Sequence, residues 1–181
     1  MRCAALGVCA SVLAMGCGLE TSAPDAPAER EVRAPHALVR ETSSGAINVA
    51  VFDAPVSCEA WPGGTFSNAS PARGVRWGLG ITLVRAWAVG PRPADDLRFE
   101  AAWADGQGAW VPRVWTNAAS FGPTASAADR PSVEILSPLG APGSTARLYL
   151  RARVESREDV QAPSRVESVD DEVTATVCAR R

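Results

Sequence analysis

The chain has 181 residues, with 18 basic side chains, 20 acidic side chains and a formal net charge of −2. All 18 basic side chains are arginines, and they are interspersed with acids instead of forming a basic cluster. This balance excludes a surface built for nucleic acid, and the length suits one folded domain.

Residues 1–16 predict an export signal. After Arg2, residues 4–15 are apolar and carry no charge. A helix of that length spans about 18 Å, well short of the roughly 30 Å hydrocarbon core, so the run is typical of a signal peptide and not of a membrane span. We therefore expect the protein to be exported.

The signal ends in Ala14-Met15-Gly16-Cys17, which resembles the lipobox of bacterial lipoproteins. Gly16 and Cys17 match the motif, whereas the usual leucine three places before the cysteine is displaced to Leu13. The resemblance covers residues 1–17 only. It implies that Cys17 carries the lipid, that the lipid holds the protein to a membrane of the bacterial cell envelope, and that Gly18 favours the outer membrane. The alternative is an ordinary signal peptide cut nearby and a secreted protein.

Residues 17–37 are rich in alanine, proline and charged side chains and contain almost nothing to bury. Such a composition predicts a disordered tether. The expected organisation is therefore a signal peptide at 1–16, the tether at 17–37 and one folded domain at 38–181.

The cysteines favour a disulfide. Cys3 and Cys9 lie in the leader and Cys17 is the lipid site, which leaves Cys58 and Cys178. An even pair in an oxidising compartment predicts a bond that closes a loop of about 120 residues and stabilises the fold by about 5 kcal/mol. Free thiols or a metal pair are the alternative, but no cysteine or histidine lies nearby to complete a metal site.

The domain alternates apolar and polar residues with a period of two, which is typical of half-buried antiparallel strands. Residues 75–83 and 172–181 show this pattern. In residues 146–156 the alternation places Tyr149 outward, between arginines. Further strands are expected at 45–53 and 132–137, and proline and glycine separate the strands.

Residues 97–116 predict a β-hairpin whose turn is Asp105-Gly106-Gln107-Gly108. In the symmetric register Trp103 faces Trp110, an aromatic pair that would stabilise the hairpin. Pro112 has no N–H for the ladder, so the second strand is expected to be an edge strand or to carry a bulge.

Seven or so short strands predict an all-β domain, a single antiparallel β-sandwich of the immunoglobulin-like or jelly-roll-like kind. Residues 155–172 are charged and poor in apolar side chains. A protruding loop or a frayed hairpin is expected there.

Catalytic chemistry is not expected. The only histidine, His36, falls in the predicted tether, so the domain lacks a base for a Ser-His-Asp or Cys-His system and histidines for a zinc site. The chain has no glycine-rich phosphate loop and no dinucleotide motif. We predict no catalytic residue, no cofactor and no enzymatic activity.

Acidic pairs are the remaining candidates for a metal site. Asp95 with Asp96, and Asp170 with Asp171, lie beside predicted turns. Adjacent acids in a strand point to opposite faces, so solvated loop charge is the first interpretation. Calcium held between two acidic loops is the alternative.

Tryptophan is abundant, with six residues against one tyrosine. Trp77 and Trp87 fall on the apolar face of their segment. Trp61 and Trp115 are predicted to be accessible, and exposed indoles suit sugar binding. The alternative is that Trp61 packs on the disulfide and that Trp115 lies under a loop.

Two functions follow from these patterns. The first is a lipid-anchored, non-catalytic interaction module that contacts another envelope protein. The second is a carbohydrate-binding module for extracellular polysaccharide or peptidoglycan, with Trp61 and Trp115 as ligand contacts.

Overall fold

The computed structural model describes residues 29–33, 35–61, 63, 66, 71–104, 109–117, 131–156 and 165–181. Of residues 111–117, 155, 156 and 165 only the backbone is described. The predicted signal peptide, Cys17 and the turn at 105–108 lie outside these residues. The described elements are β1 (Glu29–Glu31), β2 (His36–Glu41), β3 (Ile47–Phe52), β4 (Trp77–Leu83), β5 (Gly90–Pro91), the 3-10 turn η2 (Ala94–Asp96), β6 (Leu97–Ala104), β7 (Trp110–Asn117), β8 (Ser132–Ile135), β9 (Thr145–Ser156) and β10 (Arg165–Val177).

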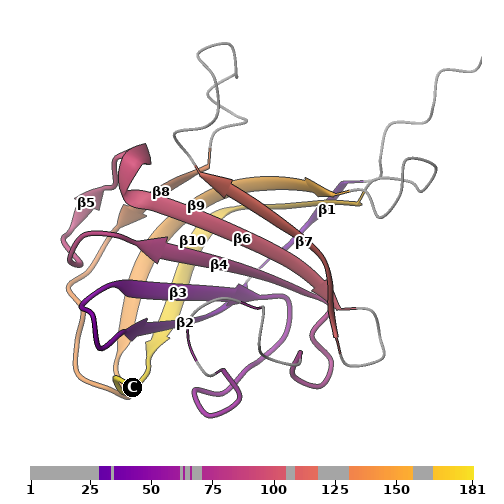
Figure 1. Cartoon of the computed structure of the whole chain (residues 1–181). Helices are drawn as coiled ribbons and strands as arrows, with labels where there is room; N and C mark the ends of the chain where they lie inside the picture. Colours follow the sequence, from indigo (N-terminus) through magenta and orange to yellow (C-terminus); the bar gives the residue numbers. More distant parts are fainter. Residues whose placement is uncertain are drawn as a thin grey trace, which may run out of the picture.

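The strands form one sheet in the order β5-β8-β9-β10-β2-β3-β4-β6-β7, with β1 beside β10. Figure 1 shows this sheet curling so that β6 and β7 cross over β9 and β10, and β7 lies close to β9. The all-β prediction is confirmed. The predicted sandwich is not confirmed, because the described strands make one half-barrel and not two separate layers.

β10 lies inside the sheet, between β9 and β2, and makes the sheet mixed. It pairs antiparallel with β9 but parallel with β1 and β2, whereas the sequence had predicted antiparallel pairing throughout. β10 and β2 come from opposite ends of the chain, so no hairpin dictates their relative direction. Residues 17–37 were predicted to be a disordered tether, but β1 and the start of β2 lie within them. Val32, between these two strands, is buried in the core.

The inner face of the curl holds the main hydrophobic core. The apolar residues of β4, β9 and β10 line it, as the period of two predicted. Trp77 is fully buried there, and Trp87 packs partly buried against the same core. The residues of the three strands in this core are Trp77, Leu79, Ile81, Leu83, Ala146, Leu148, Leu150, Ala152, Val154, Val169, Val173, Ala175 and Val177.

A second core covers part of the outer face. The β3–β4 connection, residues 53–76, packs Trp61, Phe66 and Val75 against outward side chains of β2, β3, β6 and β7. β3 is consequently buried at all six positions, which explains its unbroken apolar sequence INVAVF.

The β6–β7 hairpin carries the predicted bulge, and β7 is the edge strand. Between the pairs Ala102–Arg113 and Ala104–Trp110, one residue of β6 faces two of β7, one of which is Pro112. The predicted Trp103–Trp110 pair is therefore wrong. Trp103 faces inward opposite Trp77 of β4, whereas Trp110 belongs to the outer core.

β9 and β10 form a long regular hairpin, paired from Thr145–Thr176 to Ser156–Arg165. Most of the segment predicted as a loop or a frayed hairpin, residues 155–172, is thus strand. Residues 157–164 lie outside the described part.

Candidate functional site

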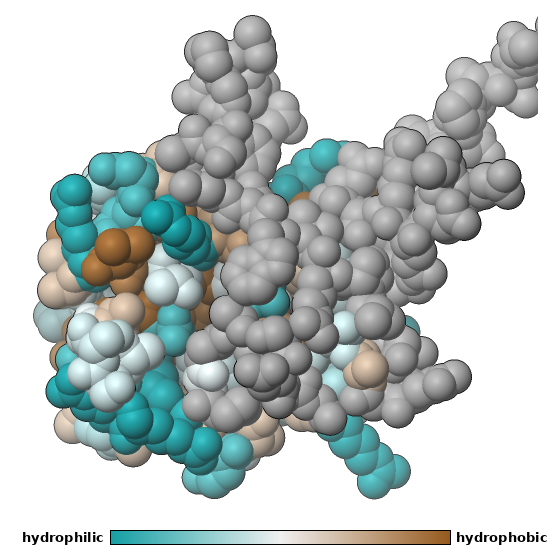
Figure 2. All heavy atoms as spheres, in the orientation of Figure 1, coloured by the Kyte–Doolittle hydropathy of each residue, from teal (hydrophilic) through white to brown (hydrophobic). Residues whose placement is uncertain are grey.

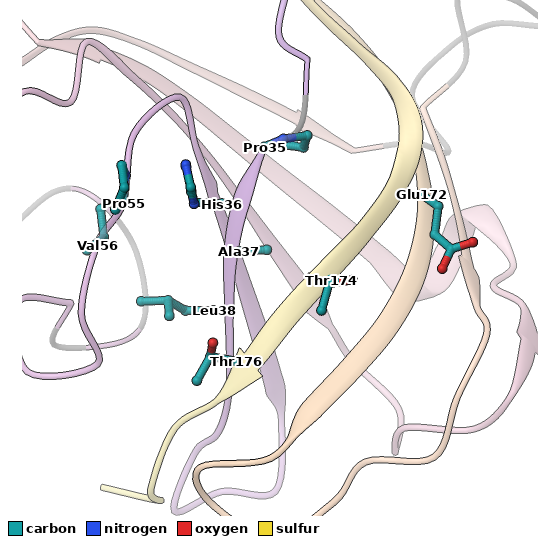
Figure 3. A pocket seen from close by; sticks show the side chains of 9 residues that line it. All are labelled: Pro35, His36, Ala37, Leu38, Pro55, Val56, Glu172, Thr174 and Thr176. Atoms are coloured by element: carbon teal, nitrogen blue, oxygen red, sulfur yellow. The ribbon is translucent and has the colours of Figure 1, made fainter.

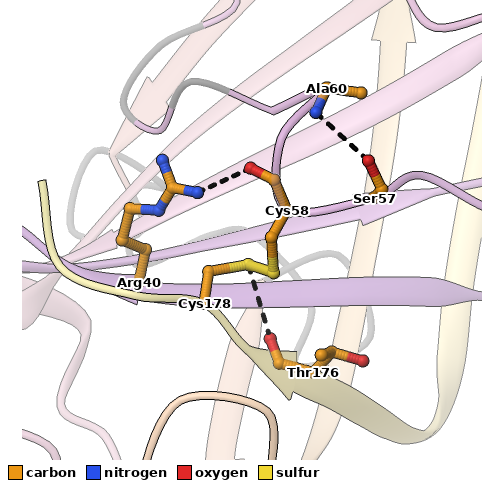
Figure 4. The surroundings of a disulfide bond; sticks show 6 residues. All are labelled: Arg40, Ser57, Cys58, Ala60, Thr176 and Cys178. Carbon is orange, nitrogen blue, oxygen red and sulfur yellow. Dashed lines mark hydrogen bonds between the residues drawn. A yellow bond between two sulfur atoms is a disulfide. The ribbon is translucent and has the colours of Figure 1, made fainter.

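The predicted disulfide is present and joins Cys58 to Cys178, 120 residues apart. It ties the β3–β4 connection to the segment that follows β10 (Figure 4). Beside it the guanidinium of Arg40 donates a 2.7 Å hydrogen bond to the carbonyl oxygen of Cys58. The connection is therefore held to the sheet by a covalent bond and by a charged donor.

Trp61 is not the accessible platform that the sequence predicted. Its side chain is 3% exposed and lies in the outer core with Cys178, which matches the packing alternative. The guanidinium of Arg40 lies 5.3 Å from the centre of the indole ring, in cation–π contact. Burial, and secondarily repulsion from Arg181, lowers the pKa of Arg40. For Trp115, only the backbone in β7 is described, so its predicted exposure stays a prediction.

Asp96 has a structural environment. Its carboxylate is 1% exposed, forms a buried ion pair with Arg92 and accepts a 2.7 Å hydrogen bond from the backbone N–H of Arg85. Asp95, in contrast, is exposed, and its carboxylate forms an ion pair with the equally exposed guanidinium of Arg85 at 3.7 Å. Both carboxylates of the first acidic pair thus interact with arginines of the protein, whereas a bound calcium ion would need carboxylate oxygens that are available to it.

The second acidic pair lies on β10. Asp170 accepts a 2.6 Å hydrogen bond from the hydroxyl of Tyr149, and Asp171 accepts one from the backbone N–H of Glu172. Within the described ranges no three histidine, cysteine, aspartate or glutamate side chains gather as a metal site would require. The calcium alternative is not supported there.

His36 lies at the start of β2, not in a tether, and lines a groove of about 390 Å³. Pro55 and Val56 of the β3–β4 connection form one wall, and Thr174 of β10 lies in the groove as well. Figure 3 shows His36 on the side of β2 that faces Pro55 and Val56, whereas the carboxylate of Glu172 points away on the far side of β10. The histidine and the carboxylate therefore do not form a catalytic pair in this arrangement.

A second groove, of about 500 Å³, lies across β1, β9 and β10. Arg151 and Asp170 line it at one end, and Glu29 and Arg153, joined by a 3.1 Å ion pair, line it as well. Hydrogen bonds from Ser168 and Arg153 lower the pKa of Glu29, so this carboxylate is held in its charged form. The groove is lined mainly by fixed charges of both signs.

The two grooves share one exposed surface, which we name the outer β9–β10 face. It consists of Arg147, Tyr149, Arg151, Arg153, Ser168, Asp170, Glu172, Thr174 and Thr176. Sequence reasoning did not select this face for binding, because it looked for tryptophan. The one available sign was Tyr149, the only tyrosine of the chain, at an outward position of a predicted strand.

Exposed apolar side chains are few. In the described part the large ones are Val84, Val89 and Tyr149, which are 54%, 61% and 40% exposed. Figure 2 shows one small brown patch at the end of the molecule where Figure 1 places β5, in surroundings that are mostly teal and white. The two valines lie at the two ends of the β4–β5 connection. The apolar surface that they expose is far too small for a stable protein interface.

Comparisons with known proteins do not assign the fold to a family. No protein-family model, no curated protein and no solved structure matches the chain. The described residues also contain no helix with the length and apolar composition needed to cross a membrane.

Proposed function

We propose that the protein is an exported, lipid-anchored module of the bacterial cell envelope that binds a partner without catalysing a reaction. The observation that carries the export step is the disulfide between Cys58 and Cys178. Stable structural disulfides belong to oxidising compartments outside the cytosol. The bond thus supports the interpretation of residues 1–17 as an export and lipidation signal.

The lipid at Cys17 keeps the domain close to its membrane. Twelve residue steps separate Cys17 from Glu29, where β1 begins. Fully extended, they reach at most about 40 Å. The partner is therefore another component of the same envelope layer, and an envelope protein is our first candidate.

The outer β9–β10 face is the contact surface that we propose for this partner. It is polar and exposed, and it has two grooves on regular strands, which present side chains in fixed positions.

The anchoring is tested by the intact mass of the mature product, made with its own leader in a bacterial host. We expect a mass that begins at Cys17 and includes acyl chains. Cys17→Ala should abolish the acylation and leave the domain folded. An unmodified mass for the natural chain would contradict the anchor and favour a secreted protein.

The contact surface is tested by photo-crosslinking in living cells. A photoreactive amino acid at Thr174, on the outer β9–β10 face, should give a discrete protein adduct. The same amino acid at Asp95, an exposed position in η2, is the control and should not give that adduct. Equal adducts at both positions would show that the proposed face has no special role.

A carbohydrate-binding module is the second candidate, and one observation favours it. Tyr149 presents an exposed aromatic ring on the outer β9–β10 face, next to a groove lined with hydrogen-bonding groups. Extracellular polysaccharide or peptidoglycan would be the ligand.

A further inference from the structure

Tyr149 is an exposed aromatic ring that is held in place. It lies within β9, which is paired with β8 on one side and with β10 on the other. Its hydroxyl donates a 2.6 Å hydrogen bond to the carboxylate of Asp170 across the strands. The ring therefore loses little conformational freedom when a ligand stacks on it, which favours binding.

The polar groups around the ring carry both signs of charge. Arg147 is paired with Glu172 at 2.9 Å beside it, and Asp170 and Arg151 connect it to the larger groove. Arg151 lines that groove, and its buried Nε has no hydrogen-bond partner among the described residues. These side chains offer donors and acceptors within one short stretch of surface.

The charge of the groove indicates the class of ligand. Its lining contains the carboxylates of Glu29, Glu31 and Asp170 and the guanidinium groups of Arg151 and Arg153. A polyanion would meet a slight excess of negative charge, and a cation would compete with arginines already in place. A neutral hydroxyl group both donates and accepts, so it fits a surface where carboxylates and guanidinium groups alternate.

We propose that Tyr149, Arg151 and Asp170 form a binding subsite for one neutral hexose unit of a polysaccharide. The apolar face of the sugar ring stacks on Tyr149, while its hydroxyls accept from Arg151 and donate to Asp170. The inference rests on the second candidate function, carbohydrate binding, and gives it a location and a ligand class.

The test is calorimetric titration of the disulfide-intact mature protein with three defined hexamers. Two are neutral, one of β-linked glucose and one of N-acetylglucosamine, and the third is the acidic hexamer of galacturonate. We expect a neutral hexamer to bind and galacturonate to bind at least about tenfold more weakly. Tyr149→Ala should weaken the neutral hexamer about tenfold or more, whereas Tyr149→Phe, which keeps the ring, should stay within about threefold of the natural chain.

Asp95→Ala, at an exposed position of η2 that is not part of the outer β9–β10 face, is the control and should leave the affinity unchanged. Circular dichroism and the melting temperature confirm that each variant is folded. Binding that Tyr149→Ala leaves unchanged would overturn the subsite and keep the carbohydrate function. Absence of binding by both neutral hexamers, or preference for galacturonate, would also overturn the proposal. The crosslinking experiment at Thr174 judges the envelope-protein function separately.

Discussion

Asp96 shows how a charged side chain can be part of the core. The carboxylate is buried, and its partners are Arg92, itself largely buried, and the backbone N–H of Arg85. Removing one member of such a pair leaves the other charge without compensation in a poorly hydrated place. The two neighbouring acids therefore have different roles. Asp95 is solvated, whereas Asp96 stabilises the turn before β6.

We predict that Asp96→Ala lowers the free energy of unfolding by about 3–5 kcal/mol, because Arg92 stays buried without its partner. Asp95→Ala, one residue earlier and exposed, should change it by less than about 0.5 kcal/mol. Urea unfolding of the two variants measures the difference. Equal losses would mean that the Arg92–Asp96 pair adds nothing to stability.

Tyr149 gives a second prediction at the scale of one residue. The hydrogen bond to Asp170, with smaller contributions from desolvation and from that negative charge, raises the pKa of the phenol above its ordinary value. The folded pKa therefore exceeds the unfolded pKa. The resulting stabilisation is present below the unfolded pKa and is lost as the pH rises through the folded pKa.

The near-ultraviolet absorbance of the phenolate follows this titration without interference, because the chain has one tyrosine. We expect its midpoint above the ordinary value of about 10, and a lower midpoint in Asp170→Asn, which removes the negative charge. Asp171→Asn is the control and should have the smaller effect. A midpoint that Asp170→Asn does not move would disprove the hydrogen bond as the cause.

At the scale of elements, the β3–β4 connection depends on two glycines of β4. A Cβ atom at Gly78 would lie 2.9 Å from the ring of Phe66 and 3.2 Å from that of Trp110. At Gly80 the closest approach, again to Phe66, would be 3.3 Å. The sequence WGLG in β4 therefore leaves room on the outer face for an aromatic ring supplied by the connection.

We predict that Gly78→Ala lowers the free energy of unfolding by about 1–3 kcal/mol, as overpacking does, and that Gly80→Ala costs less. The cause can be isolated with Phe66→Ala, which removes the ring. In that background Gly78→Ala should cost less, because of the two close rings only that of Trp110 remains, and the double-mutant cycle measures the coupling to Phe66. Additive losses would show that Phe66 is not the group displaced.

Strands that show an alternating apolar and polar pattern within their own residues were predictable from the sequence. β4, β8 and β9 lie where the period of two placed them, because one face of each meets the core. The first half of β10 was missed, since residues 165–172 are mostly polar and gain their ladder only from β9 and β1. The register of β7 was missed because the pair nearest the turn, Ala104–Trp110, is already one residue away from the predicted pairing, and the extra residue next to Pro112 shifts the later pairs by one more.

The candidate site was also predictable only in part, because some of its features depend on contacts between segments that are distant in the sequence. The disulfide followed from counting cysteines, and the outward position of Tyr149 followed from parity. Trp61 was wrongly expected at the surface, because its burial depends on how a long connection folds back over the sheet. No local pattern carries that information. His36 was assigned to a tether because β2, the strand that it begins, is stabilised by pairing with β3 and β10, and no local pattern predicts these pairings.

At the scale of the whole molecule, the disulfide joins the connection after β3 to the end of the sheet. We predict that Cys58→Ser with Cys178→Ser lowers the free energy of unfolding by about 5 kcal/mol and the melting temperature by about 10–20 °C, since the bond closes a loop 120 residues long. A reductant should have a similar effect on the natural chain and none on the double variant. A change below about 1 kcal/mol would contradict the entropic account.

The position of β10 also decides when the protein can fold. It follows the other described strands in the sequence, yet it lies inside the sheet, between β9 and β2. Among the described residues, β5, β8 and β9 are hydrogen-bonded to the β2-β3-β4-β6-β7 part of the sheet only through β10, and the main core is formed by strands from both parts. A ribosome or an export channel delivers the N-terminus first. The sheet is therefore completed only after β10 has emerged, and until then the chain is easier to thread through a narrow channel than the finished fold would be.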